Sequence, residues 1–276
     1  MEPGVYKMSF DEYAAIDAIN NSVLVRASKT MAHATVQKED TAAMKFGRDF
    51  HCYIMEMELF NDRYVFAPEG IKFNTKDGKA WKEAQGNKEI VSFEDQQTMA
   101  GMEKSLLSGE YETARNLIEK SQKEMSLIWR HKYYGELCKA RADLMFNELG
   151  IIADIKACTN SDPESWLRTG LNAGSQPHFQ PAWYLEGCES ITELKGQYNT
   201  FLWILMETNP PYGISVVQAT PAPTGEPDMV LTAKSQIDDI LPRYIAAKKS
   251  NHFEGRPDKI VHVSLPQYYL KGVSFA

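Results

Sequence analysis

Near the middle of the chain, two short segments carry aspartate and lysine residues whose types and spacing suit metal-assisted hydrolysis. Alternate residues of an extended strand share a face, so Lys139, Arg141 and Asp143 point one way in the first segment. In the second segment, Asp154 and Lys156 share the face opposite to an apolar set. If the two segments pair as a hairpin, Asp143 and Asp154 approach each other, with Lys156 beside them.

This arrangement predicts a site for a divalent cation. Two carboxylates held close together raise each other's pKa, and a divalent cation relieves their repulsion. Oxygen ligands suit Mg²⁺ or Mn²⁺ better than zinc, and Mg²⁺ usually binds one or two carboxylates together with phosphate oxygens of a substrate. Such an ion lowers the pKa of bound water and neutralises charge on a phosphate. A D-x-K triplet alone is usually a solvated strand edge, so both interpretations stay open at this point.

The surrounding pattern predicts the elements that must position these residues. We expect helices over about 9–30, 41–59 and 93–120, with a lysine- and glycine-containing loop and a short helix over 68–87. A meander of strands is expected at 125–129, 137–146 and 151–156, with further strands at 202–207 and 212–219. Helices are expected from 161, over 180–187 and over 231–249, with a loop at 221–225 between the last two.

This order predicts an α/β or α+β fold with a mixed central sheet flanked by helices. No linker is long enough to separate domains, so we expect a single domain over 1–276. Its N-terminal part, to about residue 122, is predicted to be helical, and the catalytic sheet follows from about 123 to 276.

Composition and charge exclude several classes of protein. Hydrophobic residues make up 43% and charged residues 24% of the 276 residues, which excludes a disordered or collagen-like chain. The net charge of −7 excludes a general basic coat for nucleic acid, although an acidic average can hide a local basic groove.

The cysteines and the apolar runs indicate a cytoplasmic protein without a membrane anchor. The four cysteines, Cys52, Cys138, Cys158 and Cys188, form no CxxC motif, which disfavours a structural zinc or an iron–sulfur cluster. Scattered cysteines are typical of a reducing cytoplasm. The first residues lack the apolar stretch of a secretory signal, and the longest apolar run, 201–206, is too short to cross a bilayer.

Beyond the hairpin, a series of motifs in a fixed order resembles the RecE-like (exonuclease VIII) branch of the PD-(D/E)XK nucleases. The resemblance extends from about residue 10 to the C-terminus. It departs from the family pattern at Ala142, which replaces the proline of the motif, and at Ala157-Cys158, which replaces the usual threonine pair; neither change removes a charged group. The motifs are Gly47-x-x-x-His51, Glu124 at a strand start, Cys138-Lys139-Ala140-Arg141-x-Asp143, Ile151-Ile152-x-Asp154-x-Lys156, Gln180-x-x-x-Tyr184, Pro210-Pro211-Tyr212 and Leu265-Pro266.

The resemblance implies a restriction-endonuclease-like core and assigns roles to these positions. Asp143, Asp154, His51 and the backbone carbonyl of Ile155 are implied to bind the metal ions. Taken alone, a histidine such as His51 on an amphipathic helix is more often an ordinary surface or core residue. The implied catalytic set is Lys156, Asp143, Asp154, Glu124, Gln180 and Tyr184.

Four basic residues are candidates for DNA binding. Lys139 and Arg141 share the Asp143 face, so we expect them to meet phosphates flanking the cut. Lys76 and Lys79, in the glycine-containing segment, are expected to line a DNA entrance, although an ordinary solvated loop explains them equally well.

The function that the resemblance implies is a Mg²⁺-dependent exonuclease, with Mn²⁺ as a substitute. It would digest linear double-stranded DNA from 5′ to 3′ and leave a 3′ single strand for recombination by strand annealing. The implied partners are double-stranded DNA ends, a RecT-like single-strand annealing protein of phage or prophage type, and further copies of the chain in a ring-like trimer or tetramer. The implied location is the cytoplasm of a bacterial host.

Three alternatives remain. The same core could act as an endonuclease or a single-strand nuclease. It could also have lost catalysis and serve as a DNA-binding or assembly protein, although the complete charged set disfavours this. A Cas4-like or AddB-like nuclease with an iron–sulfur cluster is disfavoured because no C-terminal cysteine group is present.

Overall fold

The computed structural model of the chain describes residues 1–36, 39–219 and 228–264. The first half contains β1 (Gly4–Lys7), α1 (Phe10–Ala15), α2 (Asn21–Ala27), α3 (Met31–Ala34), α4 (Ala42–Met55), α5 (Met57–Arg63), β2 (Tyr64–Phe66), α6 (Lys76–Ala84), β3 (Glu89–Val91), α7 (Phe93–Leu106) and α8 (Glu112–Lys120). The second half contains β4 (Gln122–Arg130), β5 (Leu137–Phe146), β6 (Ile151–Cys158), α9 (Pro163–Asn172), α10 (Phe179–Ser190), β7 (Thr200–Glu207), β8 (Ile214–Gln218) and α11 (Met229–Ser250).

A six-stranded mixed sheet in the order β1-β4-β5-β6-β7-β8 forms the centre of the molecule. Strands β4, β5 and β6 are consecutive antiparallel neighbours, which confirms the predicted meander. Strand β7 then lies parallel to β6, because α9 and α10 intervene and return the chain to the same end of the sheet. The predicted mixed sheet with flanking helices is confirmed.

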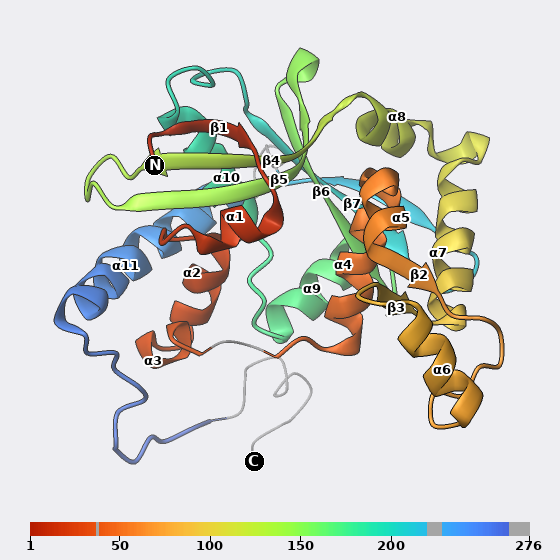
Figure 1. Cartoon of the computed structure of the whole chain (residues 1–276). Helices are drawn as coiled ribbons and strands as arrows, with labels where there is room; N and C mark the ends of the chain where they lie inside the picture. The colour runs from red at the N-terminus through yellow and green to blue at the C-terminus, as the bar shows by residue number, and fades with distance from the viewer. Residues whose placement is uncertain (37–38, 220–227, 265–276) are drawn as a thin grey trace, which may run out of the picture.

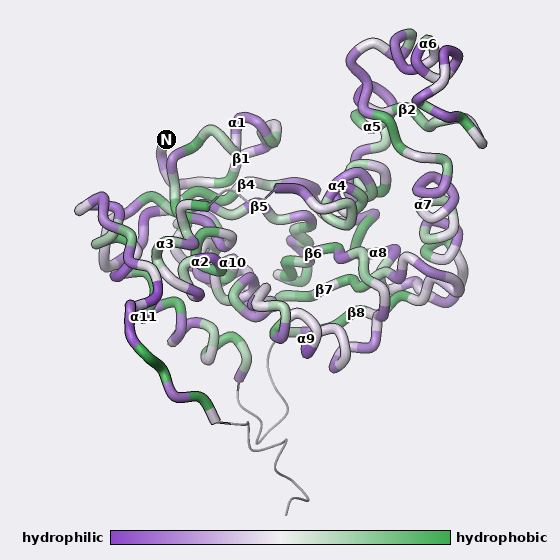
Figure 2. Tube along the Cα trace, turned by 90° about the horizontal axis from the view of Figure 1, so that it is seen from below, coloured by the Kyte–Doolittle hydropathy of each residue, from purple (hydrophilic) through white to green (hydrophobic). Residues whose placement is uncertain are grey.

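Helices cover both faces of this sheet (Figure 1). On one face, α2, α3, α10 and α11 pack against the sheet in a core that includes Trp129 and Trp183. On the other face, α4, α5, α7 and α8 build a second core around Phe50 and Ile155. Strands β6, β7 and β8 are mostly hydrophobic because they are covered from both sides (Figure 2). None of the helices in the described parts of the chain is long and apolar enough to cross a membrane.

The predicted helix over 9–30 is divided into α1 and α2, with an extended stretch between them. Ser9 and Glu12 form the expected capping box at the start of α1. The division arises at Ile19, whose backbone N–H donates to the carbonyl of Leu137 at 2.9 Å and whose carbonyl accepts from Lys139 N at 2.8 Å. Backbone groups bonded to β5 cannot form helical hydrogen bonds, so the contact with the sheet ends the helix.

Other predicted boundaries also shift. The helix expected over 41–59 divides at Glu56 into α4 and α5, and the one over 93–120 divides into α7 and α8. Strand β1 and the small parallel pair of β2 and β3 were not predicted, because each spans only three or four residues. The predicted loop at 221–225 and the Leu265-Pro266 motif lie outside the described residues.

The turn between β5 and β6 is built around a short 3₁₀ turn and Gly150. Gly150 has a φ of 62°, and a Cβ added there would lie 2.0 Å from the carbonyl oxygen of Gln197. A residue with a side chain would be strained by the positive φ and would clash with the Gln197 carbonyl. Glycine is therefore required at the turn of the hairpin that carries the predicted aspartates. The last paired residues of the hairpin before the strands diverge are Leu144 and Ala153.

Candidate active site

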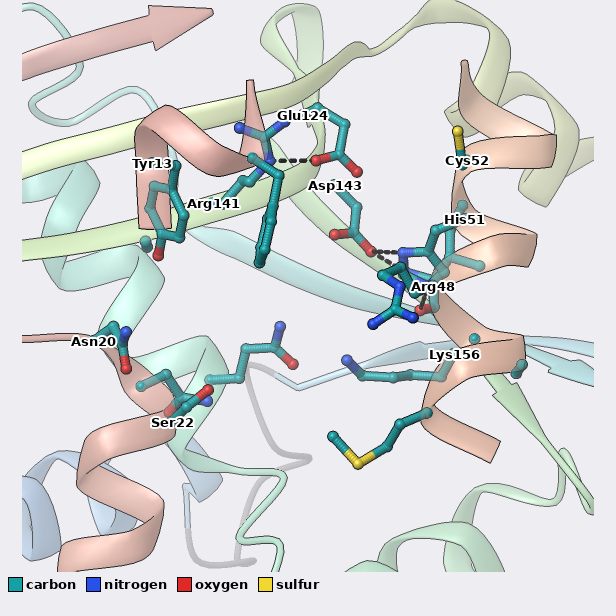
Figure 3. A pocket seen from close by; sticks show the side chains of 18 of the residues that line it. Tyr13, Asn20, Ser22, Arg48, His51, Cys52, Glu124, Arg141, Asp143 and Lys156 are labelled. Carbon is teal, nitrogen blue, oxygen red and sulfur yellow. Dashed lines mark hydrogen bonds and ion pairs between the residues drawn. The ribbon is translucent and has the colours of Figure 1, made fainter. Parts of the chain in front are cut away.

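Three potential metal ligands meet where the strands diverge. His51 on α4, Glu124 on β4 and Asp143 on β5 place one ligand atom each within 4.8 Å of one another. The flanking pairs of the β4–β5 ladder place Glu124 opposite Asp143, and Glu124 has a φ of 56° that interrupts regular strand geometry. Figure 3 shows the His51 and Asp143 side chains pointing toward each other, with Glu124 nearby.

The imidazole of His51 is oriented as a ligand. Its Nε2 lies 2.6 Å from the carbonyl oxygen of Ile155, and because a carbonyl only accepts, Nε2 must carry the hydrogen. Burial lowers the pKa of His51, which favours the neutral ring. Nδ1 then presents a lone pair to Asp143 Oδ2, 3.4 Å away. Two acceptors facing each other at this distance repel unless a proton or a metal ion lies between them, so the geometry is compatible with a bound metal ion.

The groups around the Asp143 carboxylate do not fully compensate its negative charge. Burial raises its pKa well above the usual value, and the negative charges of Asp154 and Glu124 raise it further. The backbone N–H of Ile155 donates to Asp143 Oδ2 at 2.9 Å but opposes the shift only weakly. A divalent cation would remove the cost of ionising this group. The donor set of one imidazole and two carboxylates therefore fits a divalent metal ion.

Asp154 and Lys156 form a second group beside the first. Lys156 Nζ lies 2.6 Å from Asp154 Oδ2, and the side-chain amide of Gln180 donates to Asp154 Oδ1. Burial alone would lower the pKa of Lys156, but the carboxylates of Asp154 and Asp143 raise it above its ordinary value. Lys156 is therefore a stable ammonium ion, and about a third of its side chain is exposed to the cavity (36%).

The metal-ligand roles expected of Asp154 and of the Ile155 carbonyl are only partly reflected in this geometry. Asp154 lies in the expected place beside Lys156, but its oxygens are engaged by Lys156 and Gln180, and it is not among the three converging ligands. The Ile155 carbonyl contacts His51 and so orients the imidazole. Tyr184, expected over the site, is buried and donates its hydroxyl to the carbonyl of Arg141 at 2.9 Å.

Arg141 does not have the free guanidinium expected of a phosphate contact. It forms an ion pair with Glu124 and donates to the carbonyl of Met8 at 2.9 Å. Burial raises the pKa of Glu124, and Arg141 opposes that shift. Arg141 therefore favours the ionised form of the Glu124 carboxylate and holds it in position beside Asp143, which corrects the expected role.

Lys139 also departs from its expected role in DNA binding. It shares the Arg141 face as predicted, but it is only 3% exposed. Its Nζ donates to the backbone carbonyls of Tyr13, Ala14 and Ile16 at 2.8, 3.2 and 2.7 Å. All three protons of the ammonium are thus engaged at the C-terminal end of α1, and the group cannot reach a phosphate.

Replacing Lys139 by methionine is expected to destabilise the fold by about 2–4 kcal/mol, because three carbonyls lose a charged donor. Urea unfolding measures this change. A phosphate-binding lysine would instead weaken DNA binding and leave stability unaltered, so that result would contradict the structural role. Lys195→Ala, at an exposed turn, is the matched control.

Lys76 and Lys79 lie away from the carboxylates. Both belong to α6, at the periphery of the molecule beside the β2–β3 pair (Figures 1 and 2). Neither lines the cavity that contains Asp143 and Lys156. The cluster of lysines in sequence is local to one short helix, and it does not form a wall of the site.

The site opens into one large cavity of about 1580 Å³. Its walls include α1 on one side and α4 on the other, with the ends of β5 and β6 between them. Arg48, one turn before His51, projects into this cavity and pairs with Asp40 (Figure 3). The sequence assigned no role to Arg48 or α1. Because Arg48 lies three residues before His51, the two share a helix face, and this spacing was the available signal for Arg48. No local pattern placed α1 at the site.

Solved structures include chains with a similar fold. The chain is similar in structure to a protein from Eubacterium rectale that is named "Putative exonuclease", with a TM-score of 0.59 and 13% identity, over 97% of this chain and 99% of that chain. The structure of SSO0001 aligns over 84% of this chain and 81% of that chain at 12% identity, with a TM-score of 0.34. No curated protein matches the sequence.

The first of these likenesses extends over nearly the whole chain and supports the fold alone. The sequence itself matches a family model over residues 22–262, a span that contains His51, Glu124, Asp143, Asp154 and Lys156. By this match, the chain belongs to the family described as a PDDEXK-like domain of unknown function (DUF3799).

Proposed function

We propose that the protein is a divalent-metal-dependent DNA exonuclease that hydrolyses phosphodiester bonds at the ends of linear duplexes. The observation that carries this proposal is the convergence of His51, Glu124 and Asp143 on one spot, with Lys156 beside it. A nuclease is what the family's PDDEXK description supports. The likeness to a protein named as an exonuclease favours action at DNA ends.

Each residue of the site has a separate role in the proposed hydrolysis. His51, Glu124 and Asp143 would hold the ion, which when bound activates water and neutralises charge on the scissile phosphate. Lys156, as a stable ammonium, would donate to a phosphate oxygen and stabilise the negative charge that develops there. Gln180 fixes Asp154, and Asp154 in turn holds the Lys156 ammonium in place. Arg141 holds Glu124.

Mg²⁺ is the ion we propose, with Mn²⁺ as an effective substitute. Carboxylate ligands suit both ions, and Mn²⁺ accepts an imidazole ligand such as His51 more readily than Mg²⁺ does. Loss of the His51 imidazole is therefore expected to weaken Mn²⁺ binding by a larger factor than Mg²⁺ binding.

The deciding experiment uses linear duplex DNA labelled at either the 5′ or the 3′ end, together with covalently closed circular duplex. An exonuclease of 5′-to-3′ polarity releases the 5′ label first and leaves the circle intact. Cutting of the circle at the rate of the linear duplex would instead support an endonuclease on the same core. Absence of cleavage with both Mg²⁺ and Mn²⁺ would favour the inactive DNA-binding protein.

The homo-oligomer, the annealing-protein partner and the role in recombination remain predictions that rest on the resemblance in sequence. Analytical ultracentrifugation of the purified chain tests the first: a sedimentation coefficient of a trimer or tetramer is expected. Co-purification with a RecT-like single-strand annealing protein tests the second.

A further inference from the structure

An exposed aromatic side chain lies in the wall of the catalytic cavity. Phe10, the first residue of α1, is 57% exposed, and it lines the same cavity as Asp143, His51 and Lys156. Ligand-binding cavities are commonly lined by aromatic side chains, and an exposed phenylalanine in the wall is free to pack against a bound ligand. Its ring lies 6.4 Å from that of Tyr13, tilted by 41°.

The helix that carries Phe10 is fixed at both ends. At its start, Arg141 donates to the carbonyl of Met8, and the capping box of Ser9 and Glu12 closes the first turn. At its end, Lys139 donates to three backbone carbonyls, and its Nζ also lies 4.6 Å from the centroid of the Tyr13 ring. Lys139 and Arg141 on β5 thus hold α1 in place. Their role is to fix this wall of the cavity and not to contact phosphates.

The same contacts bring Phe10 close to the reacting groups. Arg141 joins Met8, two residues before Phe10, directly to the carboxylate of Glu124. Figure 3 shows Tyr13 and Arg141 beside each other on the α1 side of the cavity, opposite His51 and Arg48 on α4. A substrate bound to the metal ligands therefore extends toward α1 on one side.

The charge around Phe10 selects the part of a nucleotide that can bind there. Asp11 and Glu12 line the cavity next to it, so this wall repels a phosphate. On the opposite wall, Arg48 contributes a guanidinium that is ion-paired with Asp40, so the α1 wall is the more negative of the two. A nucleobase is flat, uncharged and partly apolar, and every base has a face that stacks on an aromatic ring.

We propose that Phe10 is a base-stacking platform that receives the unpaired base of the nucleotide next to the scissile phosphate. This inference rests on the proposed function and adds to it the form of substrate that the cavity accepts. A base paired and stacked within a duplex cannot present its face to Phe10, so the terminal nucleotide must be unpaired before cleavage. Frayed ends and single-stranded termini are therefore the preferred substrates.

Equilibrium binding, followed by fluorescence anisotropy of a labelled single-stranded oligonucleotide in EDTA, tests this inference without requiring cleavage. Phe10→Ala is expected to weaken binding about 5- to 100-fold, the range that loss of one base–aromatic stack gives, and Phe10→Trp is expected to restore it. An oligonucleotide with abasic terminal nucleotides should bind the wild type and Phe10→Ala equally. Because Phe10 is exposed, the alanine variant should retain the wild-type melting temperature.

Leu107→Ala is the matched control, since Leu107 is equally exposed (58%) but does not line the cavity. Binding by Phe10→Ala within twofold of the wild type, or an equal loss on the abasic oligonucleotide, would overturn the stacking role. A wild type that binds oligonucleotides through Phe10 but cleaves no DNA would overturn the proposed function alone. A wild type that cleaves linear duplex while Phe10→Ala binds normally would overturn this inference alone.

Discussion

Replacing Asp143 by asparagine is expected to abolish metal-dependent cleavage, with a loss of at least about 10³-fold, and at the same time to stabilise the metal-free fold. The loss follows because asparagine removes one of the three converging ligands and its negative charge. The gain follows because Asp143 is buried beside Asp154 and Glu124, which together raise its pKa well above the usual value.

The stability change has a definite dependence on pH. A carboxyl group with a raised native pKa binds more protons in the native than in the unfolded state, so its contribution to stability falls as pH rises above the unfolded pKa of about 4. At pH 8, Asp143→Asn should therefore increase the free energy of unfolding of the metal-free protein by about 1–3 kcal/mol. Near pH 4 the difference between variant and wild type should disappear.

Urea unfolding in EDTA at several pH values, with nuclease assays in Mg²⁺, measures both effects. Asp239→Asn is the matched control, because Asp239 is an exposed aspartate on α11 outside the cavity. If Asp143→Asn is inactive but less stable than the wild type, other groups of the protein already neutralise the charge of the buried carboxylate. An active variant would remove Asp143 from the proposed metal site.

The second large effect is expected from Lys156→Ala, which should lower the cleavage rate by about 10²- to 10⁴-fold. Lys156 is an ammonium ion because Asp154 and Asp143 raise its pKa despite its burial. Its loss removes positive charge from the phosphate and leaves Asp154 without its closest cation. Lys156→Arg keeps the charge in a different shape, so it should retain part of the activity.

Single-turnover rates at saturating Mg²⁺ separate this effect from weaker metal binding. Because the ammonium stays protonated, the rate should show no decline that tracks lysine deprotonation below about pH 10. A Lys156→Ala variant that keeps more than a tenth of the wild-type rate would contradict an electrostatic role. Lys195→Ala, at an exposed turn outside the cavity, should leave the rate unchanged.

The hairpin of the site could be predicted from sequence because it is local. Polar residues at every second position of β5 and β6 indicated which residues share a face, and the short turn at Gly150 fixed their register. Asp143, Asp154 and Lys156 therefore lie side by side as expected. His51 and Glu124 could be added only through the resemblance. His51 lies on α4, which is distant in sequence from the hairpin, and a glutamate at the start of a strand carries no signal by itself.

The partners of the basic residues could not be predicted, because they depend on non-local packing. Alternation placed Lys139 and Arg141 on one face correctly, but it could not indicate that α1 would cover that face and supply carbonyl acceptors. Ile19, which joins α1 and α2 to β5, carries no polar signal in the sequence. Likewise, a run of lysines around Lys76 and Lys79 predicts an exposed segment and says nothing about its distance from the site.

The attachment of α1 to β5 bears on where the catalytic unit begins. The matched family span starts at residue 22, whereas β1 and α1 precede it. A protein trimmed to that span would lose the carbonyl acceptors of the Lys139 ammonium and the cover of its face, and it would leave the edge of β4 open to pairing with other chains, which favours aggregation. The first twenty or so residues should accordingly be kept as an integral wall of the cavity when truncations, fusions or affinity tags are designed.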